Sequence, residues 1–103
     1  MPRFEASALR DYCVSVLTAS GVERSCAEAV ADALIDAELT GVSTHGVSRL
    51  AVYMQRMDAG VMSRENNIRI VRESTSTLVV DAGNSLGAAA AKFVMERCIA
   101  KAK

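Results

Sequence analysis

The chain has 103 residues, of which 50% are hydrophobic and 23% charged, and its 12 basic side chains balance 12 acidic ones. A chain of this length can build one modest hydrophobic core. Because no excess positive charge is available to attract phosphate groups or anionic lipid, the composition argues against nucleic acid and membrane surfaces as partners.

The cysteines and the start of the chain bear on its location. Cys13, Cys26 and Cys98 are widely separated and form no C-x-x-C pair. Each falls within a helical apolar pattern, so we expect three buried thiols in a reducing compartment. The first residues contain no apolar signal-peptide region, and no apolar run has the length of a membrane span. These features predict a cytoplasmic protein.

Two amphipathic helices are predicted first. Apolar residues at helical spacing predict a helix over about 5–19, ended by Gly21. A second helical pattern begins near Glu23 to Ser25, with Ser25 and Glu28 at the spacing of a capping box, and it ends at Gly41. The short connection between the two patterns predicts a helical hairpin.

Glu38 stands out because it falls within the apolar stripe of the second predicted helix. Two interpretations of this carboxylate stay open. It either reaches solvent from the end of the helix, or it pairs with a basic group near the next segment.

The remaining segments predict a third helix, a β-hairpin and a last helix. The third helix covers 47–59, and β-branched runs at 68–71 and 78–80 predict a hairpin. Because a lone hairpin is marginal in water, we expect further strands or a helical partner for it. The last helix starts at about Leu86, and its apolar side comprises Ala90, Ala91, Val94, Met95 and Cys98. The pattern is still in register at Lys103, which suggests a chain cut from something longer.

The predicted fold class is therefore α+β, with a mainly helical first part, consisting of the helical hairpin and the third helix, followed by a β-hairpin and a carboxy-terminal helix.

The segment over residues 41–53 carries the chemistry and holds the only histidine of the chain. Wound as one continuous helix, the region places His45, Arg49, Tyr53 and Arg56 on one face and Val47, Leu50, Ala51, Met54 and Met57 on the other. An imidazole, a guanidinium one turn away and the preceding hydroxyl of Thr44 can hold a 2-hydroxy or 2-oxo acid and move a proton at its C2 oxygen. An ordinary solvent-exposed helix face gives the same separation of polar and apolar residues. The spacing alone therefore does not decide between a binding site and a solvated surface.

Other kinds of site have less support. The sequence contains no Rossmann or P-loop glycine pattern, and one histidine without a cysteine pair argues against structural zinc. Residues 83–87 open the last helix and can in principle meet a phosphate, but a turn with an N-cap is the simpler interpretation. A hydrolase pair of Thr44 or Ser43 with His45 is disfavoured, because adjacent residues on a helix point about 100° apart.

The pattern G-x-x-[S/T]-H-G-x-x-R-[L/V]-x-x-Y over 41–53 resembles the malate/L-lactate dehydrogenase family, which includes ureidoglycolate, sulfolactate and piperideine/pyrroline-2-carboxylate reductases. The likeness covers nearly the whole chain. Its other parts are Gly21-Val22, the run 33–38, Gly60, Asp81, Gly87 and Ala102-Lys103.

This resemblance implies an oxidoreductase that interconverts a small 2-hydroxy acid and a 2-oxo acid. It makes His45 the proton donor and acceptor, Thr44 the hydroxyl of its relay, and Arg49 the clamp for the substrate carboxylate. Family members more often carry serine at the position of Thr44, and the added methyl group stiffens the side chain. Tyr53 fits a packing role equally well.

The resemblance also implies that 1–103 is a single amino-terminal portion of a larger sulfolactate-dehydrogenase-like α/β fold, truncated before the cofactor-binding region. We expect NAD or NADP as cofactor, a homodimer in the full-length form, and little activity from this chain alone. The competing hypothesis is a small helical interaction module or an inactive remnant without catalysis. The identity of the acid and the choice between NAD and NADP depend on residues outside the chain.

Overall fold

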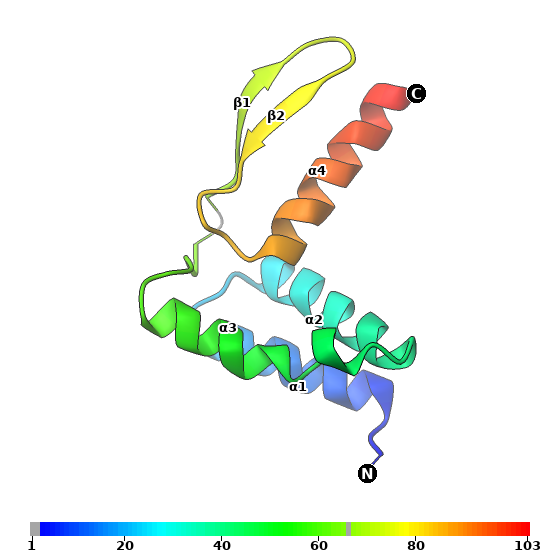
Figure 1. The fold of residues 1–103 in the computed structure, drawn as a ribbon, viewed down its shortest axis with the longest axis vertical. Coiled ribbons are helices and arrows are strands. Elements are labelled where there is room, and N and C mark those ends of the chain that lie inside the picture. Colours follow the sequence, from blue (N-terminus) through cyan, green and yellow to red (C-terminus); the bar gives the residue numbers. More distant parts are fainter. Residues whose placement is uncertain (1–2, 66) are drawn as a thin grey trace.

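The structure is a computed structural model that describes residues 3–65 and 67–103. In chain order these residues form α1 (Ala6–Ala19), α2 (Arg24–Leu39), the short 3-10 helix η1 (Ser43–His45), α3 (Arg49–Asp58), β1 (Arg69–Glu73), β2 (Leu78–Asp81) and α4 (Gly87–Ala102) (Figure 1). This element order confirms the predicted α+β class.

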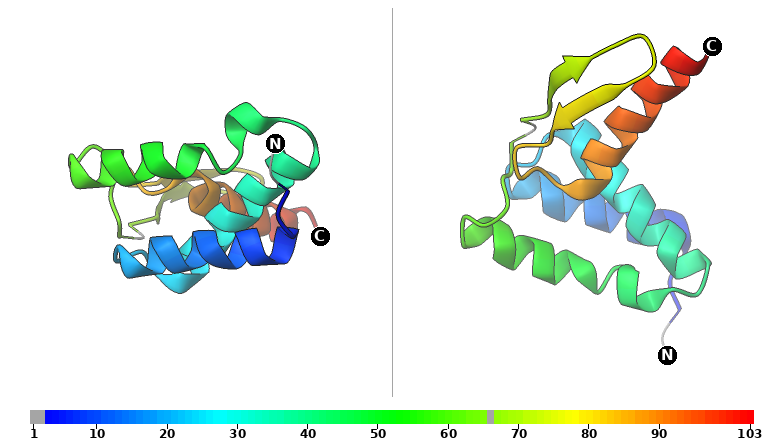
Figure 2. Two further views of the ribbon diagram at one scale, coloured as in Figure 1. Left: turned by 90° about the horizontal axis from the view of Figure 1, so that it is seen from below. Right: turned by 45° about the horizontal axis from the view of Figure 1, so that its top comes forward.

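The helical hairpin is confirmed, and α2 is its central member. Seen from below, α1 and α3 lie on opposite sides of the bundle with α2 between them (Figure 2). The connection between α1 and α2 needs glycine, because Gly21 has a φ of 105° and the next amide, of Val22, donates to Leu17 O at 3.1 Å. The side chain of Arg10 joins the two helices through Asp32 at 2.5 Å.

The predicted capping box of α2 is wrong. Ser25 lies inside the helix, and its hydroxyl donates to the carboxylate of Glu23 at 2.8 Å, not to a backbone amide. Glu23 is the N-cap residue and makes no side-chain cap bond. The helix starts at Arg24, two residues before the start that a Ser25 N-cap requires, so Ser25 is not in the capping position.

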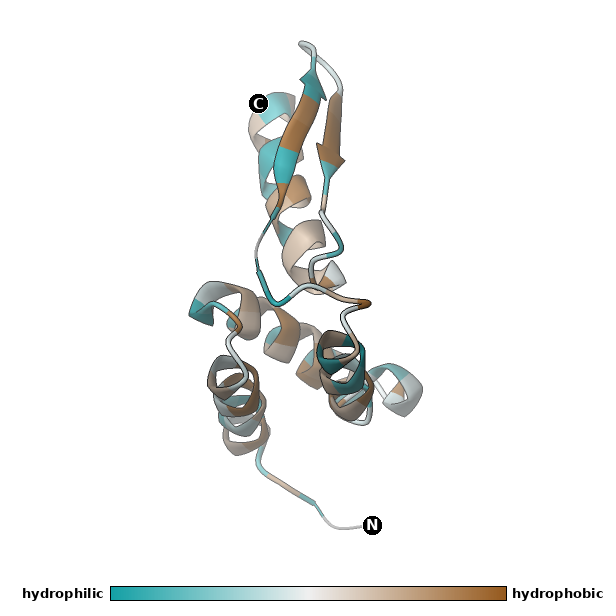
Figure 3. Cartoon of the chain, turned by 90° about the vertical axis from the view of Figure 1, so that its left-hand side faces the viewer, coloured by the Kyte–Doolittle hydropathy of each residue, from teal (hydrophilic) through white to brown (hydrophobic). Residues whose placement is uncertain are grey.

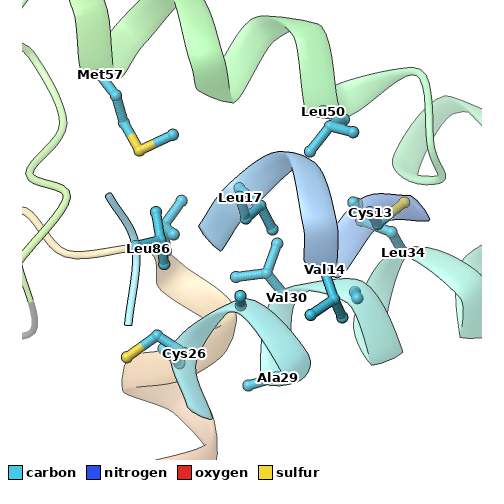
Figure 4. Close-up of a cluster of buried hydrophobic side chains, with 14 residues drawn as sticks. Cys13, Val14, Leu17, Cys26, Ala29, Val30, Leu34, Leu50, Met57 and Leu86 are labelled. Carbon is cyan, nitrogen blue, oxygen red and sulfur yellow. The ribbon is translucent and has the colours of Figure 1, made fainter. Parts of the chain in front are cut away.

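One core joins the first three helices to the start of α4. Leu17 and Cys13 of α1 are fully buried against Val30 of α2 (Figure 4). Helix α3 contributes Leu50 and Met57, seven residues apart and therefore on one face. The residues that bring α4 to this core are Leu86 and Ala89. Burial raises the pKa of the Cys13 and Cys26 thiols, which keeps them protonated.

Beyond its first turn, α4 leaves this core. Figure 3 shows α4 and the β-hairpin extending together away from the other helices, and the principal dimensions are 49 × 32 × 21 Å. Met95 is 60% exposed and Ile99 50% exposed. The prediction that Cys98 is a buried thiol is therefore wrong, because its part of α4 lies beyond the core. No helix within the described residues has both the length and the apolarity to cross a membrane.

The predicted β-hairpin is confirmed, and α4 is its helical partner. Strands β1 and β2 pair antiparallel, with Ile70 opposite Val80 and an irregularity between residues 70 and 72. The far end of the hairpin is tied to α4 by Lys101, whose ammonium group lies 2.8 Å from a Glu73 carboxylate oxygen and donates to Ser74 O at 2.7 Å. The side chains of Val71 and Val79 remain more than half exposed.

The contact between Glu73 and Lys101 should make the docking of the hairpin depend on pH. The hydrogen bond and charge of Lys101 lower the pKa of Glu73, so the contact contributes above the ordinary carboxyl pKa of about 4 and is lost as pH falls through the lower folded value. Acidification from neutral pH to about 3 should weaken the nuclear Overhauser contacts between the Lys101 side chain and residues 73–74.

Glu73→Gln should show the same weakening at neutral pH and little further change in acid. Glu96→Gln, an exposed site on α4, is the matched control and should keep the wild-type pH response. A Glu73→Gln protein that retains the full acid transition would contradict this assignment.

Candidate functional site

The third helix predicted over 47–59 corresponds to α3, but the continuous winding that placed His45 on the same helical face as Arg49 is wrong. The chain forms η1 over Ser43–His45, turns at Gly46, and begins α3 only at Arg49. Gly46 has φ −93° and ψ −148°, which is an extended conformation between the two helices. His45 and Arg49 therefore belong to different elements and do not share one helical face.

Glu38 explains where this break lies. Its Oε1 atom accepts the backbone N–H of Val47 at 3.0 Å, across nine residues of chain. The carboxylate is exposed, as the first interpretation expected, but its partner is a backbone amide and not a basic side chain. Glu38 thus fastens the connection between η1 and α3 onto the end of α2.

Gly46 is required because it lies directly over the same carboxylate. A Cβ atom built on Gly46 would come within 1.9 Å of Glu38 Oε1, far inside contact distance. Gly46 is also buried, although its neighbours in η1 are exposed. The glycine of the Thr-His-Gly sequence therefore serves close approach of the backbone to a carboxylate.

Thr44 and His45 meet on the exposed surface of η1. The Thr44 Oγ1 atom lies 3.0 Å from His45 Nδ1, which is hydrogen-bonding distance. The expectation that adjacent side chains diverge is wrong for this pair. With Nδ1 engaged by the hydroxyl, Nε2 is the ring nitrogen left for another partner.

Arg49 lies on a separate part of the site, at the first turn of α3. Its guanidinium carbon is 5.9 Å from the centre of the Tyr53 ring, within range of a cation–π interaction. Tyr53 is partly buried and also packs against the core, which agrees with the expected packing role.

A cavity of about 230 Å³ opens beside Arg49, between α3 and the start of α4. Its lining residues are Val30, Arg49, Tyr53, Arg56, Met62, Leu86, Gly87 and Ala88. Thr44 and His45 are not part of this lining. The structure therefore brings together two groups, the Thr44–His45 pair and the arginine cavity, which residues 46–48 connect.

The glycine-rich turn before α4 does not form a cradle for a nucleotide phosphate. A Cβ on Gly83 would lie 2.9 Å from Asn67 O, so protein backbone fills the space beside this glycine. The hydroxyl of Ser85 bonds to backbone oxygens, those of Glu65 and Ala82. Residues 83–87 therefore act as a turn, and they do not fit a dinucleotide. Within the described part of the chain, no group of three or more metal-ligating side chains occurs either.

Sequence reasoning missed the role of Glu38 and the far wall of the cavity. The position of Glu38 within an apolar stripe was a signal, but its amide partner depends on a turn that the helical pattern concealed. No pattern indicated that residues 86–88 would face α3.

Gly46→Ala should destabilise the protein by about 1–3 kcal/mol, because the added methyl group displaces Glu38 and frees the Val47 amide. In a Glu38→Ala background the same substitution should cost less, because the clash has been removed. Urea denaturation of the single and double variants measures this coupling.

Gly87→Ala is the matched control, since a Cβ there meets no atom within 4 Å. It should leave the free energy of unfolding nearly unchanged. Equal costs of Gly46→Ala with and without Glu38 would show that the two positions are not coupled.

Comparisons with known proteins agree with this architecture. The family model for malate/L-lactate dehydrogenase matches residues 4–103. The L-sulfolactate dehydrogenase of Methanocaldococcus jannaschii is 37% identical over 90 residues, which are 87% of this chain and 26% of that protein. The malate dehydrogenase of Pyrococcus horikoshii is 38% identical over 95 residues, which are 92% of this chain and 26% of that protein.

Solved structures give the same result. The Pyrococcus horikoshii malate dehydrogenase superposes with a TM-score of 0.94 at 36% identity, covering 98% of this chain and 29% of that one. The sulfolactate dehydrogenase of Methanocaldococcus jannaschii gives 0.92 at 33% identity, with 95% and 28% covered. The chain spans about a quarter of the length of these curated relatives. It belongs to the malate/L-lactate dehydrogenase family.

Proposed function

We propose that the protein is an oxidoreductase that interconverts a small 2-hydroxy acid and its 2-oxo acid with NAD or NADP, and that this chain carries the substrate-side residues. Support comes from the family match over 4–103 and from relatives named as malate, sulfolactate and NAD⁺-dependent ureidoglycolate dehydrogenases. The observation that carries the proposal is the 3.0 Å contact between Thr44 and His45, a short connection away from Arg49.

His45 is the proposed proton donor and acceptor. In the doubly protonated ring, Nδ1–H donates to the Thr44 hydroxyl oxygen and Nε2–H faces the substrate. The Nε2–H can protonate the C2 oxygen of a 2-oxo acid during reduction, which leaves a neutral imidazole, and the free Nε2 of that neutral ring can take the proton back during oxidation. Thr44 is thus the proposed relay hydroxyl and fixes which nitrogen reacts.

Arg49 is the proposed clamp for the substrate carboxylate. A guanidinium offers two parallel N–H groups to a carboxylate, which sets the orientation as well as the affinity of the acid. Stacking against Tyr53 limits the freedom of the side chain before an acid arrives. Among the described residues, Arg49 makes no ion pair.

The cofactor supplies the hydride and belongs, in this proposal, to residues outside 1–103. The turn at 83–87 does not fit a dinucleotide, and the relatives are about four times as long as the matched region. We place the chain as the amino-terminal portion of a cytoplasmic, homodimeric enzyme. The exposed Met95 and Ile99 on α4 fit burial against the remainder of such a protein. The same exposure also suits the competing function, an interaction module without catalysis.

A chimera tests the proposal. Residues 1–103 replace the matching portion of the Pyrococcus horikoshii malate dehydrogenase, and the product is assayed for NADH- or NADPH-dependent reduction of oxaloacetate. His45→Asn should lower kcat by about 100-fold or more, because the proton donor is lost. Arg49→Lys should raise KM by about tenfold through loss of the paired hydrogen bonds.

Arg72→Lys, on the exposed face of β1, is the control and should leave both constants unchanged. A folded chimera whose turnover is indifferent to His45→Asn would rule out the assigned proton transfer. The 103-residue chain alone should show no turnover, and robust reduction by it would overturn the placement of the cofactor site outside the chain.

A further inference from the structure

The loop that contains η1, residues 41–47, begins and ends on one residue of α2. At its start, the Gly41 amide donates to the backbone oxygen of Glu38 at 3.2 Å. At its end, the Val47 amide donates to Glu38 Oε1 at 3.0 Å. Glu38 lies in the last turn of α2, so both ends of the loop are fixed at one point of the central helix.

The two ends of this loop are held in different ways. At the start, Gly41 and Val42 donate to the backbone oxygens of Glu38 and Ala37, a common way of ending a helix at a glycine with positive φ. These bonds do not involve the Glu38 side chain. At the end, the bond to the Val47 amide depends on that side chain. Removing the carboxylate therefore releases one end of the loop and leaves the other in place.

The imidazole has few contacts of its own to hold it. Among the described residues, the Thr44 hydroxyl is the one hydrogen-bond partner of the His45 ring, at 3.0 Å, and both residues are exposed. The Ser48 hydroxyl donates to Ser43 O at 3.2 Å, but this bond joins two parts of the same connection and does not reach α2. The place of the imidazole relative to the bundle is therefore set by the two ends of the loop.

Arg49 has a second anchor that does not involve Glu38. Helix α3 is held on the core by Leu50 and Met57, which are only 6% and 2% exposed, and Leu50 follows Arg49 directly. The Arg49 guanidinium also stacks on the Tyr53 ring. Loss of the Glu38 contact should therefore displace His45 relative to Arg49, because the two residues do not depend on that contact to the same degree.

The residue next to His45 is adapted to the same contact. A Cβ on Gly46 would overlap Glu38 Oε1, so the loop has glycine where it crosses the carboxylate. Gly46 is buried, although His45 is exposed. The carboxylate thus supports the backbone beside His45 and leaves the ring itself open to a ligand.

We propose that Glu38 is a positioning residue for the reaction, whose carboxylate holds the loop so that the His45 ring is aligned with an acid bound by Arg49. The inference rests on the proposed function, which makes His45 the proton donor and Arg49 the clamp. Proton transfer needs the donor within hydrogen-bonding reach of the C2 oxygen, and a misplacement of about 1 Å can lower the rate by about 100-fold. Glu38 acts through the Val47 amide and touches neither reacting group.

Kinetics of the chimera test this role. Glu38→Ala should lower kcat for oxaloacetate reduction by about 10- to 100-fold and change KM by less than about threefold, because Arg49 stays anchored on α3. Glu38→Gln keeps an oxygen that can accept the Val47 amide and should recover most of the loss. Asp36→Ala removes the same charge from an exposed site on α2 and is the matched control, which should leave both constants unchanged.

A second background separates positioning from a loss of folded enzyme. In a His45→Asn chimera, Glu38→Ala should lower kcat little further, because no proton donor is left to position. A smaller folded fraction would instead lower the rate by the same factor in both backgrounds. Equal factors in the two backgrounds, or a Glu38→Gln enzyme as impaired as Glu38→Ala, would overturn the inference.

Spectra of the 103-residue chain follow the loop without any turnover. Glu38→Ala should shift the carbon-bound proton resonances of the His45 ring, whereas Glu38→Gln and Asp36→Ala should keep them close to wild type. If these shifts occur but a folded chimera reduces no 2-oxo acid, the loop contact stands and the proposed function fails. Ring resonances unchanged by Glu38→Ala would overturn the positioning role, whatever the activity of the chimera.

Discussion

The hydrogen bond from the Val47 amide to the Glu38 carboxylate is the constraint on which the arrangement of the site depends. It ties the connection after η1 to the end of α2, the helix at the centre of the bundle. Gly46 permits this contact because no Cβ fits above the carboxylate. This one hydrogen bond sets the position of η1, which carries His45. It also sets the start of α3, which carries Arg49.

This constraint divides the chemistry between two neighbouring elements. Thr44 and His45 lie on an exposed turn, where the imidazole is open to a ligand. Arg49 and Arg56 face a cavity closed on its far side by the start of α4. Leu86 holds that wall against the core, so the hydrophobic packing of α4 also shapes the place where we propose the acid binds.

Much of the fold could be predicted from the sequence, because the apolar stripes of α1 and α2 match their buried faces and the β-branched runs match the paired strands β1 and β2. The break at Gly46 could not, since the polar and apolar residues from His45 to Met57 also fit one uninterrupted helix. Only the tertiary contact with Glu38 decides between a helix and a turn there. The prediction that Cys98 is buried was wrong for the opposite reason. The helix predicted around it does form, but that part of α4 lies beyond the core.

The exchange rate of the Val47 amide hydrogen, followed by two-dimensional NMR, tests the central constraint most directly. If Glu38 holds this amide, its exchange should be slowed on the order of tenfold relative to Glu38→Ala under identical conditions. Identical rates in the two proteins would contradict the account, because the connection between α2 and α3 would then be held by something other than Glu38.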